Sequence, residues 1–320
     1  MQEFAADTAT GLENGERTMN ANEMTFGIEI ETHMPAGSVY PGNHGCGRQV
    51  DWLPAGWLAD ADPSIITPSS SRVACEFVSP VLAGADGLRQ VVEVIAEIKR
   101  RGGQVNASCG LHVHVGFDKR NTPAVGRLIS LVSNHEKALY AVTGTRSREQ
   151  GVGSRYRTCW CKSVKQYGNK SAARHAASRD RYHLLNLATS KPTVEFRVFG
   201  ASLNADKVCA YVRLCVGLAE KALVSKKSAA WNASNRPTSK SNFGLGEGAT
   251  AGVVEATRLL FSLGWLTRGG AHGFPVVTAD GQTAYQKSFG VIEGEGIPTM
   301  IAARKELARL ADKYDTAPAV

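Results

Sequence analysis

The sequence predicts an α+β fold in which a mostly antiparallel sheet carries helices on one face. The segments with strand character alternate polar and apolar residues, as in Phe26–Glu31, whereas strands buried in a parallel sheet are continuous apolar runs. Helical segments, with apolar residues three and four positions apart, lie between these strands. The turn sequence Ser190-Lys191-Pro192 predicts a hairpin between two consecutive strands. Together these patterns favour helices packed on an antiparallel sheet.

The same patterns place the individual elements in chain order. Strands are expected at about 24–33, 73–79, 109–117, 182–188 and 193–199, with a Gly- and Pro-rich insertion at 35–64. Gly102-Gly103 should end the first helix, because glycine commonly terminates helices. Thr122-Pro123 should begin the second, because proline suits a first turn. Helices are expected at about 87–101, 122–140, 206–224, 251–264 and 298–313.

Composition divides the 320-residue chain into four expected parts. Residues 1–23 are polar and lack an apolar segment, which predicts a disordered leader and not a secretory signal. Residues 24–225 hold the strands and should form the main domain. The stretch 226–250, rich in Ser, Lys, Asn and Gly, is expected to be a linker or loop. Residues 251–320 are expected to form a helical C-terminal extension.

Cysteine content and hydropathy indicate a cytoplasmic protein. The seven cysteines are an odd number in a chain that is neither short nor secreted, so free thiols are expected. No stretch approaches the ~20 apolar residues of a membrane helix, so no membrane partner is expected.

Acidic and basic residues recur two positions apart within the predicted strands. Side chains at this spacing point to the same face of a strand, so three of the strands should each present a polar pair to one side and apolar residues to the other. Burying such groups is costly unless they are paired or bind a metal. Taken singly, each would also suit a solvent-facing strand, but together they predict a cleft lined by ligands for Mg²⁺ or Mn²⁺, which favour oxygen. The residues are Glu29 and Glu31, Glu76, His112 and His114, and Glu195 and Arg197.

In their order and spacing, four motifs resemble those of the amidoligase family, whose members are carboxylate–amine ligases with the glutamine synthetase and glutamate–cysteine ligase fold. The resemblance covers about residues 24–225 and implies a glutamine synthetase-like catalytic domain. It also implies an ATP-dependent ligase that forms an amide or isopeptide bond through an acyl phosphate. The motifs are Phe-Gly-Ile-Glu-Ile-Glu-Thr at 26–32, Glu-Phe-Val-Ser-Pro at 76–80, Gly-Leu-His-Val-His-Val at 110–115 and Glu-Phe-Arg-Val-Phe at 195–199.

The resemblance implies roles for individual residues, with small-molecule or peptide carboxylates and amines as substrates. One departure is Thr193, which stands where glutamine synthetases carry an arginine, so another arginine is expected to contact phosphate. The expected metal ligands are Glu29, Glu31, Glu76, His112 and Glu195. The expected ATP contacts are Arg155, Arg157, Arg179, Arg197 and His114. The expected catalytic residues are Arg197, Arg181, Tyr182 and Asn186, with Tyr182 and Asn186 on one face of a strand.

A basic run at 145–181 lies between two of the ligand-bearing strands and contains only two acidic residues. Because arginine offers phosphate oxygens a planar donor fork, we expect this loop to clamp nucleotide phosphates and to close over them. The run would also suit a nucleic-acid-binding module, with Tyr156, Trp160 and Tyr167 available for base stacking, although nucleic acid is the less favoured partner.

Two other metal sites remain open from the residues alone. A metal-dependent hydrolase could use His112 and His114, but such enzymes usually carry further His or Asp nearby, where this chain has Gly116 and Phe117. A zinc site is also conceivable, although Cys-x-Cys differs from the Cys-x-x-Cys of zinc ribbons. It would use Cys159, Cys161, His44 and Cys46.

Overall fold

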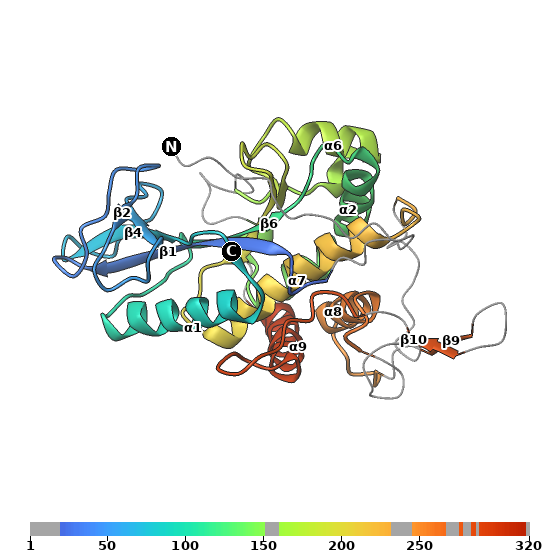
Figure 1. The fold of residues 1–320 in the computed structure, drawn as a ribbon. Helices are drawn as coiled ribbons and strands as arrows, with labels where there is room; N and C mark the ends of the chain where they lie inside the picture. Colours follow the sequence, from blue (N-terminus) through green and yellow to red (C-terminus); the bar gives the residue numbers. More distant parts are fainter. Residues whose placement is uncertain are drawn as a thin grey trace.

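An antiparallel sheet forms the centre of the computed structural model, which describes residues 20–150, 160–231, 245–266, 275–277, 283–285 and 288–317 (Figure 1). The strand order is β2-β3-β4-β1-β6-β8-β7, and β5 pairs with one end of β1. All of these pairings are antiparallel, which confirms the expected fold class. The strands are β1 (Thr25–Pro35), β2 (Arg48–Gln49), β3 (Leu58–Asp60), β4 (Arg72–Val78), β5 (Leu82–Ala83), β6 (Gly110–Gly116), β7 (Leu185–Asn186) and β8 (Thr193–Gly200).

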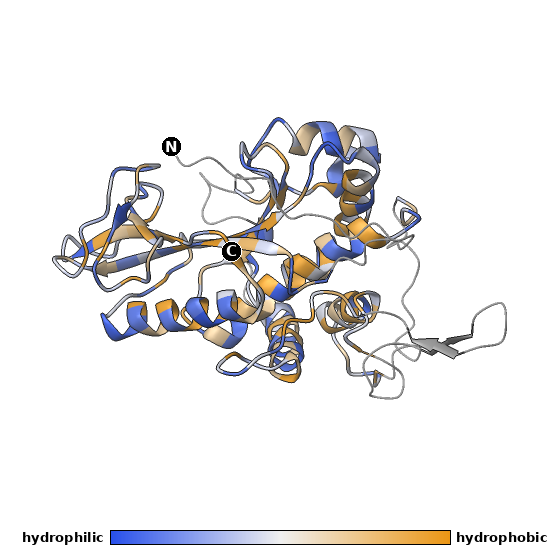
Figure 2. Cartoon of the chain, viewed as in Figure 1, coloured by the Kyte–Doolittle hydropathy of each residue, from blue (hydrophilic) through white to orange (hydrophobic). Residues whose placement is uncertain are grey.

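The apolar face of the sheet is covered by α1 (Gly84–Arg100) and α7 (Ala205–Val224), which lie along one side of it in Figure 1. Alternate residues of β1 and β6, such as Ile28 and Val113, are fully buried. Phe199 of β8 stacks on Tyr211 of α7, with ring centroids 4.0 Å apart. Figure 2 shows hydrophobic and hydrophilic residues mixed along α1, as expected of a helix with one buried face.

Two C-terminal helices pack against the same core. Helix α8 (Ala251–Ser262) contacts α3 (Glu136–Ala141), and α9 (Met300–Thr316) contacts α7, α3 and α8. Arg213 of α7 is fully buried, and its guanidinium donates hydrogen bonds to the carbonyls of Ile292 and Pro298 at 2.6–2.9 Å. One hydrophobic cluster therefore runs from β1 to α9.

The structure differs from the sequence prediction at three elements. The helix expected at 122–140 is divided into α2 (Thr122–Asn134) and α3, because His135 between them has a non-helical φ of −115°. The strand expected at 182–188 is reduced to β7, because the backbone around His183 bridges to Lys162 instead. The insertion at 35–64 contributes β2 and β3 to the edge of the sheet.

The basic segment at 145–181, expected to be a loop, forms helices where it is described. They are α4 (Ser147–Gln150), the 3₁₀ turn η1 (Lys165–Tyr167) and α6 (Lys170–Ala177). The buried carboxylate of Glu136 on α3 fixes the segment, because it accepts hydrogen bonds from the Ser163 hydroxyl and from the amides of Val164 and Lys165 at 2.5–3.1 Å. Residues 151–159 lie outside the described ranges.

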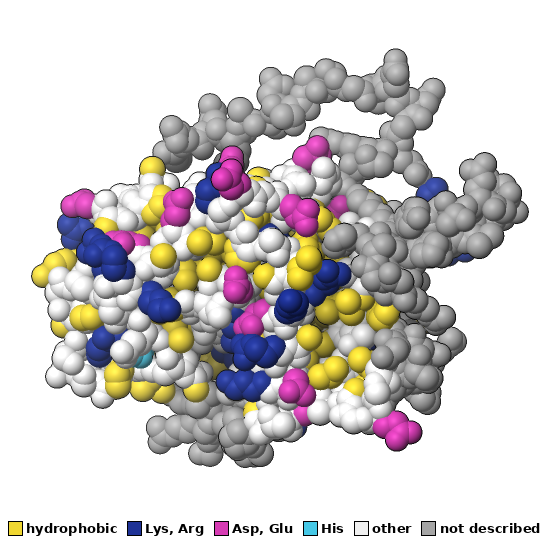
Figure 3. Space-filling model, turned by 90° about the horizontal axis from the view of Figure 1, so that it is seen from below, with side chains coloured by type: hydrophobic (Ala, Val, Ile, Leu, Met, Phe, Trp, Pro, Cys, Tyr) yellow, Lys and Arg dark blue, Asp and Glu magenta, His cyan; other side chains and the backbone are white. Residues whose placement is uncertain are grey.

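Other expectations concern segments that are described only in part. The leader at 1–23 lies almost wholly outside the described residues, and much of the linker at 226–250 does too. Farther on, β9 (Pro275–Val277) pairs with β10 (Thr283–Tyr285). Among the helices of the described ranges, none is long and apolar enough to cross a lipid bilayer. Figure 3 shows basic and acidic side chains interspersed on the face seen from below.

Candidate active site

The polar face of the sheet brings the expected metal ligands of β1, β4 and β6 together. The strand register places Glu31 opposite Glu76 and Glu29 opposite His112, and opposite residues on one face are close enough to interact. The imidazole of His112 lies at the centre. Its Nδ1 is 3.0 Å from Oε2 of Glu29 and 3.9 Å from Oε1 of Glu76, and its Nε2 is 3.5 Å from Oε1 of Glu31.

The fifth expected ligand, Glu195, joins this group from β8. It lies opposite His114 on β6 and opposite Asn186 on β7. Its Oε1 is 3.8 Å from Nδ1 of His112 and accepts a hydrogen bond from Nη1 of Arg197 at 2.5 Å. The amide of Asn186 donates to its other oxygen at 2.5 Å. Asn186 and Arg197 therefore fix the orientation of a buried carboxylate.

Three overlapping groups of side chains are spaced so that each could hold a metal ion, because their ligand atoms lie within 4.8 Å of one another. The three groups are Glu29–Glu76–His112, Glu29–His114–Glu195 and Glu31–Asp62–Glu76. The first two share Glu29. All five expected ligands are included, and His114, which was expected to contact ATP, belongs to the second group.

Sequence reasoning missed two buried acids, Asp60, which is the last residue of the short strand β3, and Asp62, which follows it. Asp60 lies opposite Glu76 in the sheet register, and one of its carboxylate oxygens has no hydrogen-bond partner among the described atoms. The signal was present, because Asp60-Ala61-Asp62 has the same two-residue spacing as Glu29 and Glu31. It was overlooked because the insertion that contains it has no strand-like pattern.

Crowding of carboxylates has a large effect on Glu76. Burial, together with the negative charges of Glu29, Glu31, Asp62 and Asp60, raises the pKa of Glu76 to about 9. Like charges held close together in a medium of low polarity disfavour ionisation. Without a bound cation, Glu76 is therefore mostly protonated at neutral pH.

The opposite shift occurs where the histidines and Arg197 meet the acids. Burial acts to raise the pKa of Glu29, but hydrogen bonds from His112 and His114 bring it well below its ordinary value. Burial also acts to raise the pKa of Glu195, and the nearby charges of His112, Arg197 and His114 lower it. These two carboxylates are therefore held ionised and ready to bind a cation.

Gly110, the first residue of β6, has no side chain and therefore leaves room for the charged groups to converge. Its amide donates to Oε2 of Glu31 at 2.6 Å. A Cβ atom at this position would lie 2.7 Å from Nη2 of Arg148, 3.1 Å from Nε2 of His112 and 3.2 Å from Oε1 of Glu31. Arg148 is buried and donates to the carbonyl of Phe199 at 2.5 Å. This arginine of the basic segment is thus placed beside the acidic cluster.

A cavity of about 320 Å³ opens beside the acidic groups. Four of the residues expected to bind ATP or to act in catalysis line it, namely His114, Arg181, Asn186 and Arg197. Glu29 and Glu195 form its acidic part, and Thr189, Ser190 and Lys191 form the wall contributed by the β7–β8 turn. Cations and carboxylates thus share one opening.

Other expected site residues lie elsewhere. Tyr182 does not line this cavity and does not share a strand face with Asn186, because β7 begins only at Leu185. Its ring instead packs edge-on against Trp160, with centroids 5.0 Å apart. Arg179 is exposed and does not line the cavity. Arg155 and Arg157 lie outside the described residues.

The structure brings no support for a zinc site at the cysteines. Cys159 lies outside the described residues, and the thiol of buried Cys161 contacts the carbonyl of Arg197 at 3.0 Å. None of the metal-capable groups found in the described part of the chain contains His44, Cys46 or Cys161. The six described cysteines are free thiols.

Comparison with known proteins agrees with this arrangement. Residues 40–219 match a family model described as "Putative amidoligase enzyme". The match spans more than half of the chain and includes β4, β6 and β8 with Glu76, His112 and Glu195, whereas β1 precedes it. No curated protein matches the chain. The match thus covers the strands that carry three of the five clustered ligands. The chain therefore belongs to the amidoligase family.

Proposed function

We propose that the protein is an ATP-dependent carbon–nitrogen ligase, which joins a carboxylate to an amine through an acyl phosphate in a cleft that binds Mg²⁺ or Mn²⁺. The observation that carries this proposal is the convergence of five ligand side chains from four strands on one face of the sheet. Membership of the amidoligase family supports the reaction class. The substrates would be small molecules or peptides, and a glutamine synthetase-like fold would provide the scaffold.

The donor set fits a hard divalent cation, because carboxylate oxygens dominate it. Burial and repulsion by the neighbouring acids raise the pKa of Glu76 to about 9, and a bound cation would relieve that repulsion. The ion would be held by Glu29, Glu76 and His112, with a second position at Glu29, His114 and Glu195. When bound, such ions neutralise triphosphate charge and orient the nucleotide.

Cations of the chain would hold the phosphate and carboxylate oxygens beside the metal. The Nε of Arg197 is buried and has no hydrogen-bond partner among the described atoms, so it can donate to a bound anion. Arg181 lies at the mouth of the same cavity. Lys191, two residues before Thr193, also lines it and can supply the charge that Thr193 lacks. Asn186 would act as a positioning residue, because it orients Glu195.

The chemistry requires mainly positioning and charge neutralisation from the protein. A carboxylate does not react with an amine at neutral pH until it is activated, and transfer of a phosphoryl group from ATP supplies that activation. Such a transfer is accelerated by in-line positioning and by cations around the phosphoryl oxygens. The grouping of carboxylates with Arg181, Lys191 and Arg197 suits this task.

Nucleotide binding provides a test that needs no knowledge of the substrates. We expect calorimetry to detect ATP binding with Mg²⁺ and about 10- to 100-fold weaker binding in EDTA or in Glu31→Gln, since loss of groups that support a metal site typically costs this much. Val198→Ile, a conservative change in the same sheet, is the control and should bind as the wild type does. Equal ATP affinity with Mg²⁺ and in EDTA would contradict the proposal.

A screen of amino acids and peptides should then reveal amine-stimulated release of ADP. This release should require Mg²⁺ or Mn²⁺ and should fall in Arg197→Lys, which keeps the charge but loses the planar donor fork. Nucleotide-independent hydrolysis would favour the metal-dependent hydrolase instead.

The nucleic-acid alternative draws less support, because three of the described cations of the basic segment lie in separate surroundings. Arg148 is buried against β8, Lys162 pairs with Asp180 at 2.6 Å, and Arg181 lies at the acidic cavity.

A further inference from the structure

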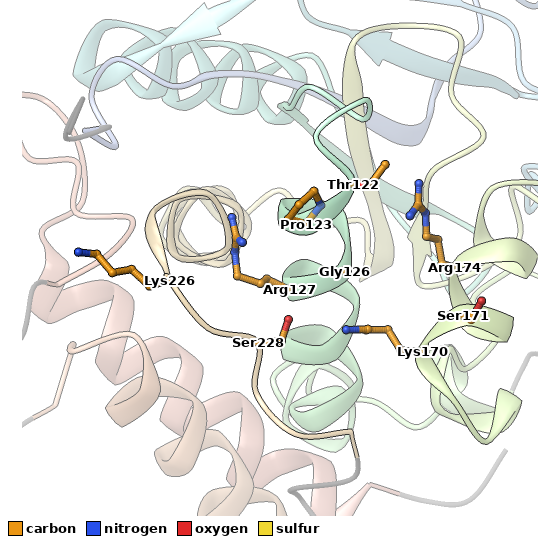
Figure 4. A pocket seen from close by; sticks show the side chains of 9 residues that line it. All are labelled: Thr122, Pro123, Gly126, Arg127, Lys170, Ser171, Arg174, Lys226 and Ser228. Atoms are coloured by element: carbon orange, nitrogen blue, oxygen red, sulfur yellow. The ribbon is translucent and has the colours of Figure 1, made fainter.

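A second cavity lies between α2, α6 and the segment that follows α7, and it differs from the acidic cleft in every lining residue. Its volume is about 460 Å³, which is within the range of small-molecule sites. Four cationic side chains line it, and none of its described lining residues is acidic. Figure 4 shows Arg127 on α2, Lys170 and Arg174 on α6, and Lys226 after α7.

The cations of this cavity are placed by the surrounding helices. Arg127 is anchored, because its Nε donates to the carbonyl of Ala222 at 2.6 Å and its Nη2 to that of Leu223 at 3.3 Å. These bonds leave Nη1 for a ligand. Lys170 lies along α2, where Gly126 lacks a side chain, and its Nζ is 3.7 Å from the position of a Cβ atom there. Within the described part of the chain, the side chains of Lys170 and Arg174 form no hydrogen bond or ion pair.

The other lining groups indicate the chemistry of the ligand. Thr122, Ser171 and Ser228 add hydroxyls, and no aromatic side chain is present to stack on a base or sugar. The amides at the start of α2 are already used, since Ala124 donates to the Asn121 side chain and Thr122 to the carbonyl of Arg120. Recognition must therefore come from side chains. Arginine and lysine grouped with hydroxyls suit phosphate oxygens.

We propose that this cavity binds a compact polyanion that carries two or more phosphate groups, at a site separate from the acidic cleft. Arg127, Lys170 and Arg174, with no acid among the described lining residues, match several negative charges better than one, and the hydrophilic lining suits a ligand without a large apolar part. Either free polyphosphate or a phosphorylated metabolite has this chemistry. The proposal does not depend on the ligase reaction, because the two cavities share no residue.

Calorimetry with inorganic tripolyphosphate in EDTA tests the proposal, because without metal the carboxylates of the cleft repel anions. We expect binding to the wild type and about 100-fold weaker binding to Lys170→Ala/Arg174→Ala, at about tenfold for each charged hydrogen bond lost. The matched control is Lys99→Ala/Lys137→Ala, which removes two exposed cations outside the cavity. It should stay within about twofold of the wild type.

Several results would overturn the proposal. The first is an equal loss of tripolyphosphate affinity in the two double variants. The second is orthophosphate binding as tightly as tripolyphosphate. The third is a tetra-aspartate peptide or a single-stranded oligonucleotide binding more tightly than tripolyphosphate. A phosphorylated metabolite that competes with tripolyphosphate would identify the source, and its absence from a metabolite extract would leave free polyphosphate as the ligand. Circular dichroism of each variant confirms that it is folded.

Discussion

The two faces of the central sheet are made by alternate residues of the same strands, yet they serve opposite purposes. On β1, Ile28 and Ile30 are buried in the hydrophobic core, whereas Glu29 and Glu31 lie among other carboxylates. The apolar face gains free energy from every side chain that it removes from water. The polar face removes carboxylates from water and holds them close together, and this burial and repulsion raise the pKa of Glu76 to about 9. The comparison teaches that a cleft lined by buried carboxylates is built at a cost to stability, which the opposite face offsets.

The sharpest way to break this comparison is to replace one residue on each face. Phe196 of β8 is fully buried on the apolar face, and Phe196→Ala should lower the free energy of unfolding by about 3–5 kcal/mol through lost burial and a cavity. Glu76→Gln keeps the side-chain volume and replaces a carboxyl group whose raised pKa leaves it mostly protonated at neutral pH, so it should not lower stability in EDTA. Urea denaturation of both variants measures the difference. A comparable loss in Glu76→Gln would refute the distinction between the faces.

A second test addresses the space that the polar face needs. Gly110→Ala places a methyl group against Arg148, His112 and Glu31, and overpacking of this kind typically costs about 1–3 kcal/mol. We also expect weaker binding of Mn²⁺, measured by electron paramagnetic resonance, because the ligands must move apart.

Gly200 provides the matched control for Gly110. It lies opposite Gly110 in the sheet register, and no atom lies within 4 Å of the position of its Cβ. Gly200→Ala should therefore bind Mn²⁺ as the wild type does. If Gly110→Ala behaved in the same way, the close convergence of charged groups at this point would be unnecessary for the site.

The smallest expected effect concerns a buried ionisable side chain among the helices, away from the carboxylate cluster. Burial, with the nearby charges of Arg258 and Lys221, lowers the pKa of His135 to about 3. In the unfolded chain this histidine takes up a proton below about pH 6.5, so the unfolded state binds more protons and stability falls as the pH decreases. Between pH 7.5 and pH 5 the loss should be about 2 kcal/mol.

His135→Gln isolates this contribution, because glutamine does not titrate. Any change in packing should affect the variant equally at both pH values, so urea denaturation should show a smaller difference between pH 7.5 and pH 5 than in the wild type. The same pH dependence in both proteins would assign it to other groups, such as the carboxylates of the cleft.

Local regularities of the sequence were enough to predict much of this protein. The two-residue spacing of Glu29 with Glu31, and of Glu195 with Arg197, required each pair to share a strand face, because alternation is a property of the extended backbone itself. The helices around Leu88 and Val212 followed from apolar spacing in the same way. The fold class and the five clustered acids and histidines were therefore accessible before any contact between strands was known.

Only the tertiary structure decided which strands are neighbours and in what register, because pairing depends on contacts between residues far apart in the chain. It brought Asp62 from an irregular insertion to Glu76, and it placed Arg148 beside Gly110. It also removed Tyr182 from the expected strand, since His183 bridges to Lys162. The basic cavity arose in the same way: Arg127 and Lys170 belong to separate helices, and no periodicity within either one could show that they face a common space.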